Sequence, residues 1–248
     1  KETEIPSLYQ VLEGIQPAQT PAVRVVSEPG KYRKAENLWV VSYIVLEQLL
    51  EDVAQKSFPQ IASDLLFSPL GLKNTTFEQP LPENLWPQTS WGHQTKRIIH
   101  GAAHVYPTRA AMGLWTSPTD LAHILIEIMK SYRGLSTLIV SQNTVKQLID
   151  LDNPYFQWYS NGGGYYCFYA FDARVGQGIV IMINHEAGHD LRREITHSFF
   201  QAWKWRWGNF ILTDRLIFSG MIYAALVFFV LIIFLGGVLF IRQSRRKL

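Results

Sequence analysis

Apolar side chains recur every three or four positions in several stretches of the chain, which is the spacing of one face of a helix. The stretch at 117–132 also has a helix start signal, which consists of Ser117, Pro118 and Asp120. A serine hydroxyl caps the first turn of a helix, and a carboxylate is favoured near the positive end of the helix dipole. The pattern predicts helices over residues 38–54, 58–67, 117–132 and 190–203, and another that starts at Ser141.

Two shorter stretches have the apolar character of strands. Residues 165–171 and 178–183 are separated by a Gly-Gln-Gly segment at 176–178, which predicts a β-hairpin. Residues 1–36 and 78–108 are rich in proline and polar side chains and show little periodicity, so both are expected to be dominated by loops. Strands and helices together predict an α+β fold.

The longest apolar stretch lies near the C-terminus. Residues 216–241 contain no charged side chain. A bilayer core needs about 20 apolar residues in a helix, and a helix satisfies its own backbone polar groups in hydrocarbon. The sequence therefore predicts one transmembrane helix over 216–241, with the lipid bilayer as a partner.

Charges on either side of this stretch predict its direction. Arg242, Arg245, Arg246 and Lys247 follow it, whereas only Arg215 and Asp214 stand directly before it. Positive side chains stay on the cytoplasmic side, so the C-terminus is expected in the cytoplasm and the N-terminal domain outside. The expected organisation is a domain over 1–208, a linker over 209–215, the helix over 216–241 and a basic tail over 242–248.

Composition narrows the remaining possibilities. The formal net charge is only +3 and the positive residues are dispersed along the chain, which argues against a nucleic-acid-binding face. Cys167 is the single cysteine, so an internal disulfide is excluded.

Three segments resemble one family of enzymes. Residues 69–77 (PLGLKNTTF) are similar to a PLGM-x-x-T-x-F segment, residues 104–122 contain HVYP and AAMGLWTSPTDLA, and residues 176–184 read GQGIVIMIN. In this order they resemble the class C beta-lactamase and penicillin-binding-protein family of serine hydrolases, over most of residues 7–208. The resemblance implies an antiparallel sheet flanked by helices.

The catalytic motifs of that family are degenerate in this sequence. Its serine nucleophile stands in S-x-x-K upstream of these segments, and the one such match here, Ser244 to Lys247, lies in the basic tail. The family's Tyr-x-Asn motif aligns with Leu38, Trp39 and Val40. Its Lys- or His-x-Gly motif aligns with Trp158, Tyr159 and Ser160. None of these replacements supplies the expected proton carrier or cation, so the resemblance implies a catalytically inactive relative.

Two other motifs offer alternative chemistry. Tyr159, Ser160 and Asn161 spell Tyr-Ser-Asn, but they follow the PLG segment rather than precede it. His185, Glu186 and His189 match H-E-x-x-H, which on a helix would present two zinc ligands and a general base. Here the motif directly follows an apolar strand and contains Gly188, which disfavours a helix. A zinc hydrolase is therefore the least favoured hypothesis, and no cofactor is expected.

The resemblance also implies an incomplete fold. In the family, the first two strands and the nucleophile helix precede the point that corresponds to Lys1. The strand at 178–183 would then have an open apolar edge, which natural proteins cover. We expect another polypeptide segment or subunit to complete the sheet. The leading interpretation is a membrane-anchored interaction subunit, and the alternative is an active serine hydrolase completed by a segment that carries S-x-x-K.

Overall fold

The computed structural model describes residues 5–18, 22–23, 38–95, 97–99, 105–149 and 155–203. The chain forms two compact units, residues 1–189 and residues 190–248, and each is described by itself. The predicted transmembrane segment 216–241 and the basic tail lie outside the described residues. Within the ranges given above, no helix is long and apolar enough to cross a bilayer.

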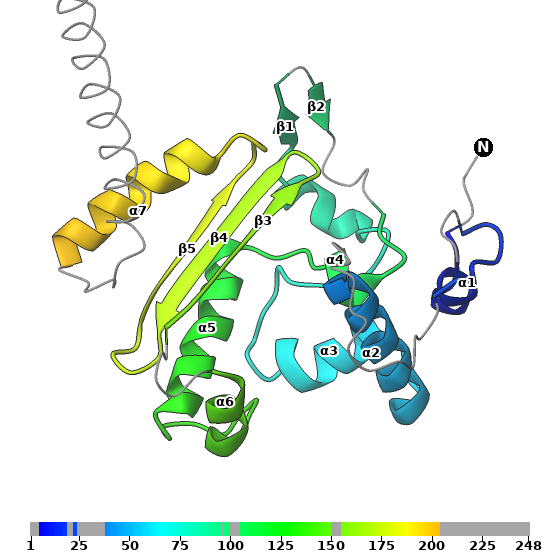
Figure 1. Ribbon diagram of the computed structural model, residues 1–248, viewed down its shortest axis with the longest axis horizontal. Helices are drawn as coiled ribbons and strands as arrows, with labels where there is room; N and C mark the ends of the chain where they lie inside the picture. The colour runs from blue at the N-terminus through cyan, green and yellow to red at the C-terminus, as the bar shows by residue number, and fades with distance from the viewer. Residues whose placement is uncertain are drawn as a thin grey trace, which may run out of the picture. The chain divides into compact units, whose positions relative to one another are not determined.

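A three-stranded antiparallel sheet forms the centre of the first unit (Figure 1). Its order is β3 (Tyr155–Gly162), β4 (Tyr165–Asp172) and β5 (Gln177–Ile183). The β4–β5 hairpin confirms the prediction made from the Gly-Gln-Gly signal. The sequence prediction missed β3, whose glycine-rich turn at Gly162, Gly163 and Gly164 joins it to β4.

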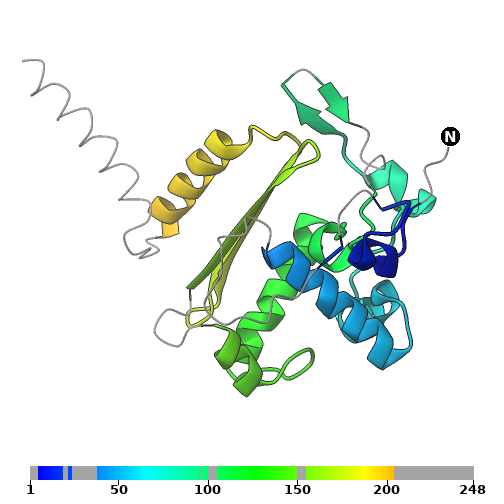
Figure 2. The same cartoon turned by 45° about the vertical axis from the view of Figure 1, so that its right-hand side comes forward.

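One face of the sheet is covered by α5 (Pro118–Tyr132), as the edge-on view in Figure 2 shows, and α6 (Gln142–Leu148) packs against α5. Ser117 caps α5 and Ser141 caps α6 through their side-chain oxygens, as the sequence predicted. The main apolar core lies between these elements. It consists of Leu125, Met129, Val145, Ile149, Phe171 and Ala173.

Further helices form the other part of this unit. They are α1 (Leu8–Glu13), α2 (Leu38–Ala54), α3 (Phe58–Ala62), the π-helical turn η1 (Ser63–Phe67) and α4 (Arg109–Met112). Helix α2 has the predicted bounds, and α3 with η1 covers the predicted helix at 58–67. The expectation of a loop-dominated N-terminus missed α1, where Ser7 and Gln10 cap each other's backbone and Gly14 ends the helix at φ 64°.

The proline-rich stretch at 78–108 is also more regular than predicted. It contains the 3-10 helix η2 (Glu83–Gln88) and a hairpin of β1 (Gly92–Gln94) and β2 (Arg97–Ile99). The hairpin was not predicted because each strand is only three residues long. The last described helix, α7 (His189–Trp203), agrees with the prediction for 190–203.

Candidate functional site

The segment aligned with the family's Tyr-x-Asn motif forms the first turn of α2. The backbone of Leu38, Trp39 and Val40 is helical, and the structure describes nothing of these three side chains. Tyr43 lies one turn further along and is half exposed. Burial, together with the nearby Cys167 and Tyr43, raises the pKa of Tyr169 on β4 to about 12. Tyr43 is therefore near enough to Tyr169 to interact with it electrostatically.

The segment aligned with the family's third motif lies on β3, the edge strand of the sheet. Trp158 is opposite Tyr169, and Ser160 is opposite Cys167, so Trp158 and Ser160 share one face of the sheet. Tyr159 lies on the other face and stacks on Tyr166 with 6.3 Å between ring centroids. Because Tyr43 and Trp158 both lie beside Tyr169, the fold brings the two aligned motif segments into the same region.

Cys167 is the nucleophile-type side chain with the most perturbed pKa in this region. Burial raises the pKa of its thiol to about 11. A thiol with this pKa is almost entirely protonated at neutral pH, and the thiolate is the reactive form. Cys167 is therefore a packing residue rather than a substitute for the missing serine nucleophile.

Helix α2 exposes an apolar face. Most of the side chains of this helix are apolar, and those of Glu47 and Glu51 lie on the side opposite this face. Six of its large apolar side chains are between 43% and 75% exposed. They are Tyr43, Val45, Leu46, Leu49, Leu50 and Val53.

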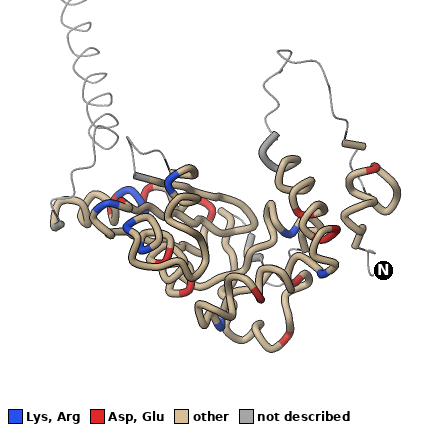
Figure 3. Tube along the Cα trace, turned by 90° about the horizontal axis from the view of Figure 1, so that it is seen from below, with Lys and Arg blue, Asp and Glu red and all other residues tan. Residues whose placement is uncertain are grey.

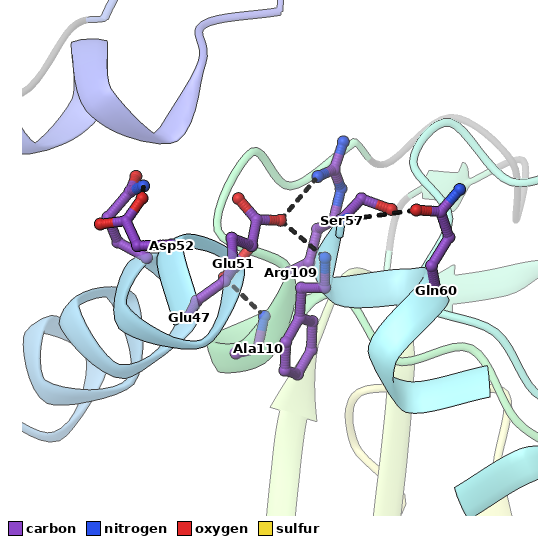
Figure 4. A network of polar contacts seen from close by, with 9 residues as sticks. Glu47, Glu51, Asp52, Ser57, Gln60, Arg109 and Ala110 are labelled. Atoms are coloured by element: carbon purple, nitrogen blue, oxygen red, sulfur yellow. Dashed lines mark hydrogen bonds and ion pairs between the residues drawn. The ribbon is translucent and has the colours of Figure 1, made fainter. Parts of the chain in front are cut away.

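In contrast, the one carboxylate in the middle of α2 is buried. Glu47 is only 1% exposed, and its Oε2 accepts a hydrogen bond of 2.8 Å from the backbone N–H of Ala110 (Figure 4). Its other carboxylate oxygen, Oε1, has no hydrogen-bond partner among the described residues. Burial raises the pKa of Glu47, and the hydrogen bonds from Ala110 and Arg109 only partly oppose this effect.

Glu51 extends this polar network by one helical turn. Its Oε1 accepts a 2.7 Å hydrogen bond from the backbone N–H of Phe58 and lies 3.9 Å from Nη1 of Arg109 (Figure 4). Glu47 and Glu51 together attach α2 to α3 and α4. Sequence reasoning missed this role because the partners Arg109 and Ala110 are distant from α2 in the sequence.

The H-E-x-x-H motif does not form the helical face that a zinc site of this kind requires. Residues 185–188 form a turn, and the helix begins only at His189. Nδ1 of His185 accepts a hydrogen bond from the backbone N–H of Ala187. In the part of the chain with described positions, no group of three or more potential metal-ligating side chains is found. The turn agrees with the argument from the sequence that Gly188 and the preceding strand disfavour a helix here.

Glu186 instead holds the β1–β2 hairpin against the sheet. Its Oε1 accepts hydrogen bonds from Gln94 Nε2 at 2.6 Å and from the backbone N–H of Gly164 at 3.1 Å. A Cβ atom at Gly164 would lie 2.7 Å from the backbone of Gly92, so only glycine allows this close approach. The carboxylate proposed as a zinc-site base thus has a structural role.

The segments that carry the family resemblance meet in space. Thr76 and Trp115 form a β-bridge that joins the PLG segment to the start of α5. Asp120 is 7% exposed and accepts hydrogen bonds of 2.8 Å from the backbone N–H of Asn74 and the hydroxyl of Thr75. This buried contact explains why the two segments occur together.

Comparison with known families agrees with this arrangement. The model of the beta-lactamase family matches residues 24–201, which is more than half of the chain. The chain belongs to the beta-lactamase family, and the predicted relationship to class C beta-lactamases and penicillin-binding proteins is confirmed. Among curated proteins, none matches the sequence.

Solved structures show the same fold at low sequence identity. FmtA from Staphylococcus aureus is 15% identical with a TM-score of 0.60, and the match covers 82% of this chain and 58% of FmtA. An octameric penicillin-binding protein homologue from Pyrococcus abyssi is 15% identical with a TM-score of 0.57, covering 86% and 52%. A class C beta-lactamase is 15% identical with a TM-score of 0.52, covering 69% and 57%. The chain thus spans between half and three-fifths of the length of each of these proteins.

Proposed function

We propose that this chain is a membrane-anchored, catalytically silent member of the beta-lactamase family that acts as an interaction subunit. The observation that carries the proposal is the region around Tyr169. There, Trp158 pairs with Tyr169 at the position that the sequence alignment matches to the family's cation, and Tyr43 belongs to α2, which exposes apolar side chains. A surface of this kind suits protein contact better than it suits proton transfer.

Catalytic silence is supported by the chemistry of the side chains in this region. Acyl transfer by a serine hydrolase needs an activated nucleophile and a group that can accept and return a proton. The aligned positions hold Leu38, Val40 and Trp158, which can do neither. Cys167 is held as a neutral thiol by its raised pKa.

A role in association is supported by two surfaces that another polypeptide segment could cover. The first is the exposed face of α2, and the second is the outer edge of β5, which has no partner strand among the described residues. The strand reads GIVIMI from Gly178 to Ile183 and carries no charge. Uncharged apolar edges promote aggregation unless they are covered, so we propose that an added strand and an apolar helix complete the fold.

Anchoring rests on the uncharged stretch at 216–241 and the basic tail after it. The proposed orientation has the family domain outside the cytoplasm and the tail inside. Extraction of cell membranes with alkaline carbonate tests the anchor, because an integral protein stays in the pellet. Deletion of 216–241 should release the domain, and retention of that deletion variant in the pellet would disprove this anchor.

A site-specific photo-crosslinker tests the interaction role. It is placed at Leu49 on the exposed face of α2 and, as a matched control, at Leu65 in η1, which is 68% exposed. We expect a discrete crosslinked product from Leu49 in intact membranes and none from Leu65. Mass spectrometry then tells whether the captured segment belongs to the same precursor or to another subunit. Equal products from both positions, or none, would contradict the interaction role.

Activity-based labelling separates the silent subunit from the alternative of an active serine hydrolase. The native complex is treated with a fluorescent penicillin and a fluorophosphonate probe, with the penicillin-binding proteins of the same membranes as positive control. We expect no label on this chain or on the segment that completes it. A labelled serine in the completed fold would establish the alternative, in which the missing segment supplies S-x-x-K.

A further inference from the structure

Four large aliphatic side chains are exposed in three neighbouring segments. These segments are the loop after α5, the end of α6 and the β4–β5 turn. Leu135, Leu138, Leu148 and Val175 are 65%, 56%, 75% and 55% exposed, and we call this set the aliphatic tip. Transfer of these side chains from water into apolar surroundings would be favourable.

The segments of the aliphatic tip are held together by defined contacts. Nε2 of Gln142, at the start of α6, donates a hydrogen bond of 3.1 Å to the backbone carbonyl of Tyr132 at the end of α5. The guanidinium of Arg133 lies over the β4–β5 turn, since a Cβ atom at Gly176 would be 2.7 Å from its Nη1. These contacts bring the start of α6 and the β4–β5 turn next to the end of α5.

Charge is distributed unevenly in the segments that carry the tip; Figure 3 draws Lys and Arg in blue and Asp and Glu in red along the chain. The two carboxylates, Glu127 and Asp172, are buried, with side chains only 7% and 10% exposed. Lys130 and Arg174 pair with them from the outside and remain more than half exposed. The other charged side chains of the described segments 127–149 and 172–178 are both cations, Arg133 and Lys146. Asp150 and Asp152 follow in the sequence, outside the described residues.

We propose that the aliphatic tip docks on the surface of an anionic lipid bilayer. Leucine and valine side chains enter the boundary between headgroups and acyl chains, and the surrounding cations contact lipid phosphates. A lipid surface fits this composition better than a protein does. Leucine and valine are under-represented among the residues that dominate protein–protein binding, whereas tryptophan and tyrosine are enriched, and neither aromatic is among the tip side chains.

This proposal adds a second membrane contact to the proposed function and uses the anchor only to bring the domain near a bilayer. The test places a fluorescent label at the tip through Leu148→Cys and at the equally exposed Leu65→Cys as control. Both variants carry Cys167→Ala, so that each has one thiol. The full chain is reconstituted in nanodiscs of phosphatidylcholine alone or mixed with phosphatidylglycerol, and quenching by brominated acyl chains is measured.

We expect several-fold stronger quenching at Leu148 than at Leu65 in the anionic nanodiscs. High salt, or the pair Arg133→Gln and Lys146→Gln, should reduce the quenching at Leu148 at least twofold. Hydrogen exchange of the unlabelled chain should show protection of residues 133–149 in the same anionic discs. Equal quenching at the two positions, or protection that does not depend on phosphatidylglycerol, would overturn the proposal.

The test of lipid binding by the aliphatic tip can be separated from the test of the proposed anchor. If the chain does not enter nanodiscs, the anchor at 216–241 is wrong, and the same labelled chains are then mixed with phosphatidylglycerol vesicles. Quenching at Leu148 under those conditions still supports the tip as a lipid-binding surface. Its absence there overturns the tip proposal independently of the anchor.

Discussion

Helices α5 and α2 are both long and both rich in apolar side chains, yet their surroundings differ. In α5 the apolar side chains Leu125 and Met129 are buried against the sheet. In α2 the apolar side chains Leu49 and Val53 are exposed, and the carboxylate of Glu47 is buried. The difference is that α5 packs its apolar side chains against the sheet, whereas α2 leaves an apolar face exposed among the described residues.

The polar contacts of the two helices repeat this contrast. Asp120 at the start of α5 joins a cap, a loop and a neighbouring threonine in one satisfied network. Glu47 in α2 satisfies one carboxylate oxygen and leaves the other without a partner among the described residues. An unsatisfied buried oxygen is costly, and a further segment or a proton would relieve it.

The largest expected effect on stability distinguishes the buried core beside α5 from the exposed apolar face of α2. Phe171→Ala should lower the free energy of unfolding by about 3–5 kcal/mol, because it leaves a cavity in the core between α5 and the sheet. Leu49→Ala, on the exposed face of α2, should change that free energy by less than about 0.5 kcal/mol in the isolated chain. Thermal unfolding of the purified chain in one detergent compares them. A large loss for Leu49→Ala would mean that this chain covers the face itself.

The next largest effect on stability is expected at the hydrogen-bond network of Asp120, at the start of α5. Asp120→Ala should lower the free energy of unfolding by about 1.5–3 kcal/mol, since the backbone N–H of Asn74 and the hydroxyl of Thr75 lose a charged acceptor. Asp190→Ala is the control, because the Asp190 side chain is 82% exposed and should be almost neutral. Chemical denaturation followed by tryptophan fluorescence measures both. Equal losses would contradict the role assigned to Asp120.

The buried carboxylate of α2 should produce a smaller, pH-dependent effect. Glu47→Leu removes the acceptor for the Ala110 N–H and should cost about 1–3 kcal/mol. Glu47→Gln keeps an acceptor and removes the charge. Because burial raises the pKa of Glu47 above 4.5 in the folded chain, its contribution to stability is full below pH 4.5 and declines as pH rises through the folded-state pKa.

The Glu47→Gln variant should therefore be more stable than wild type at neutral pH, and the advantage should shrink toward acidic pH. Melting temperatures of wild type, Glu47→Gln and Glu47→Leu across this pH range provide the comparison. If Glu47→Gln is less stable than wild type at neutral pH, the Glu47 carboxylate has a compensating partner that the described residues lack.

The smallest expected effect is a stabilisation at the end of α2. Gln55 has a left-handed backbone with φ of 52°, a conformation that costs a non-glycine residue about 1–2 kcal/mol. Gln55→Gly should raise the free energy of unfolding by about 0.5–1 kcal/mol, after the entropy cost of glycine is subtracted. Gln48→Gly, inside the same helix, should lower it by about 1 kcal/mol. A loss of stability in Gln55→Gly would show that the Gln55 side chain matters more than its backbone conformation.

Much of the local structure could be predicted from the sequence. Residues 38–54 and 117–132 have apolar spacing and end signals that depend only on neighbouring residues, and α2 and α5 match them to within one residue. The β4–β5 hairpin followed from a glycine-containing turn between two apolar runs. The family relationship followed from short segments in the right order, which Asp120 and Thr76 hold together.

Other features needed the three-dimensional contacts. The strand β3 contains polar and aromatic residues without a clear pattern, and it is a strand because it pairs with β4 along its whole length. The structural role of Glu186, next to His185, became clear only from its hydrogen bonds with Gln94 and Gly164, which are distant in the sequence. Periodicity could not reveal the burial of Glu47, because its hydrogen-bond partner Ala110 is distant in the sequence.

The sequence by itself determined the bounds of the main helices and the family, because side-chain spacing and residue identity are local properties. Only the tertiary structure decided which apolar side chains are covered and which are exposed. Exposure depends on segments that meet across long sequence separations, so Leu125 and Leu49 have the same chemistry and opposite surroundings. That difference, on α2 and at the aliphatic tip, is the basis for the proposed contacts with another polypeptide segment and with lipid.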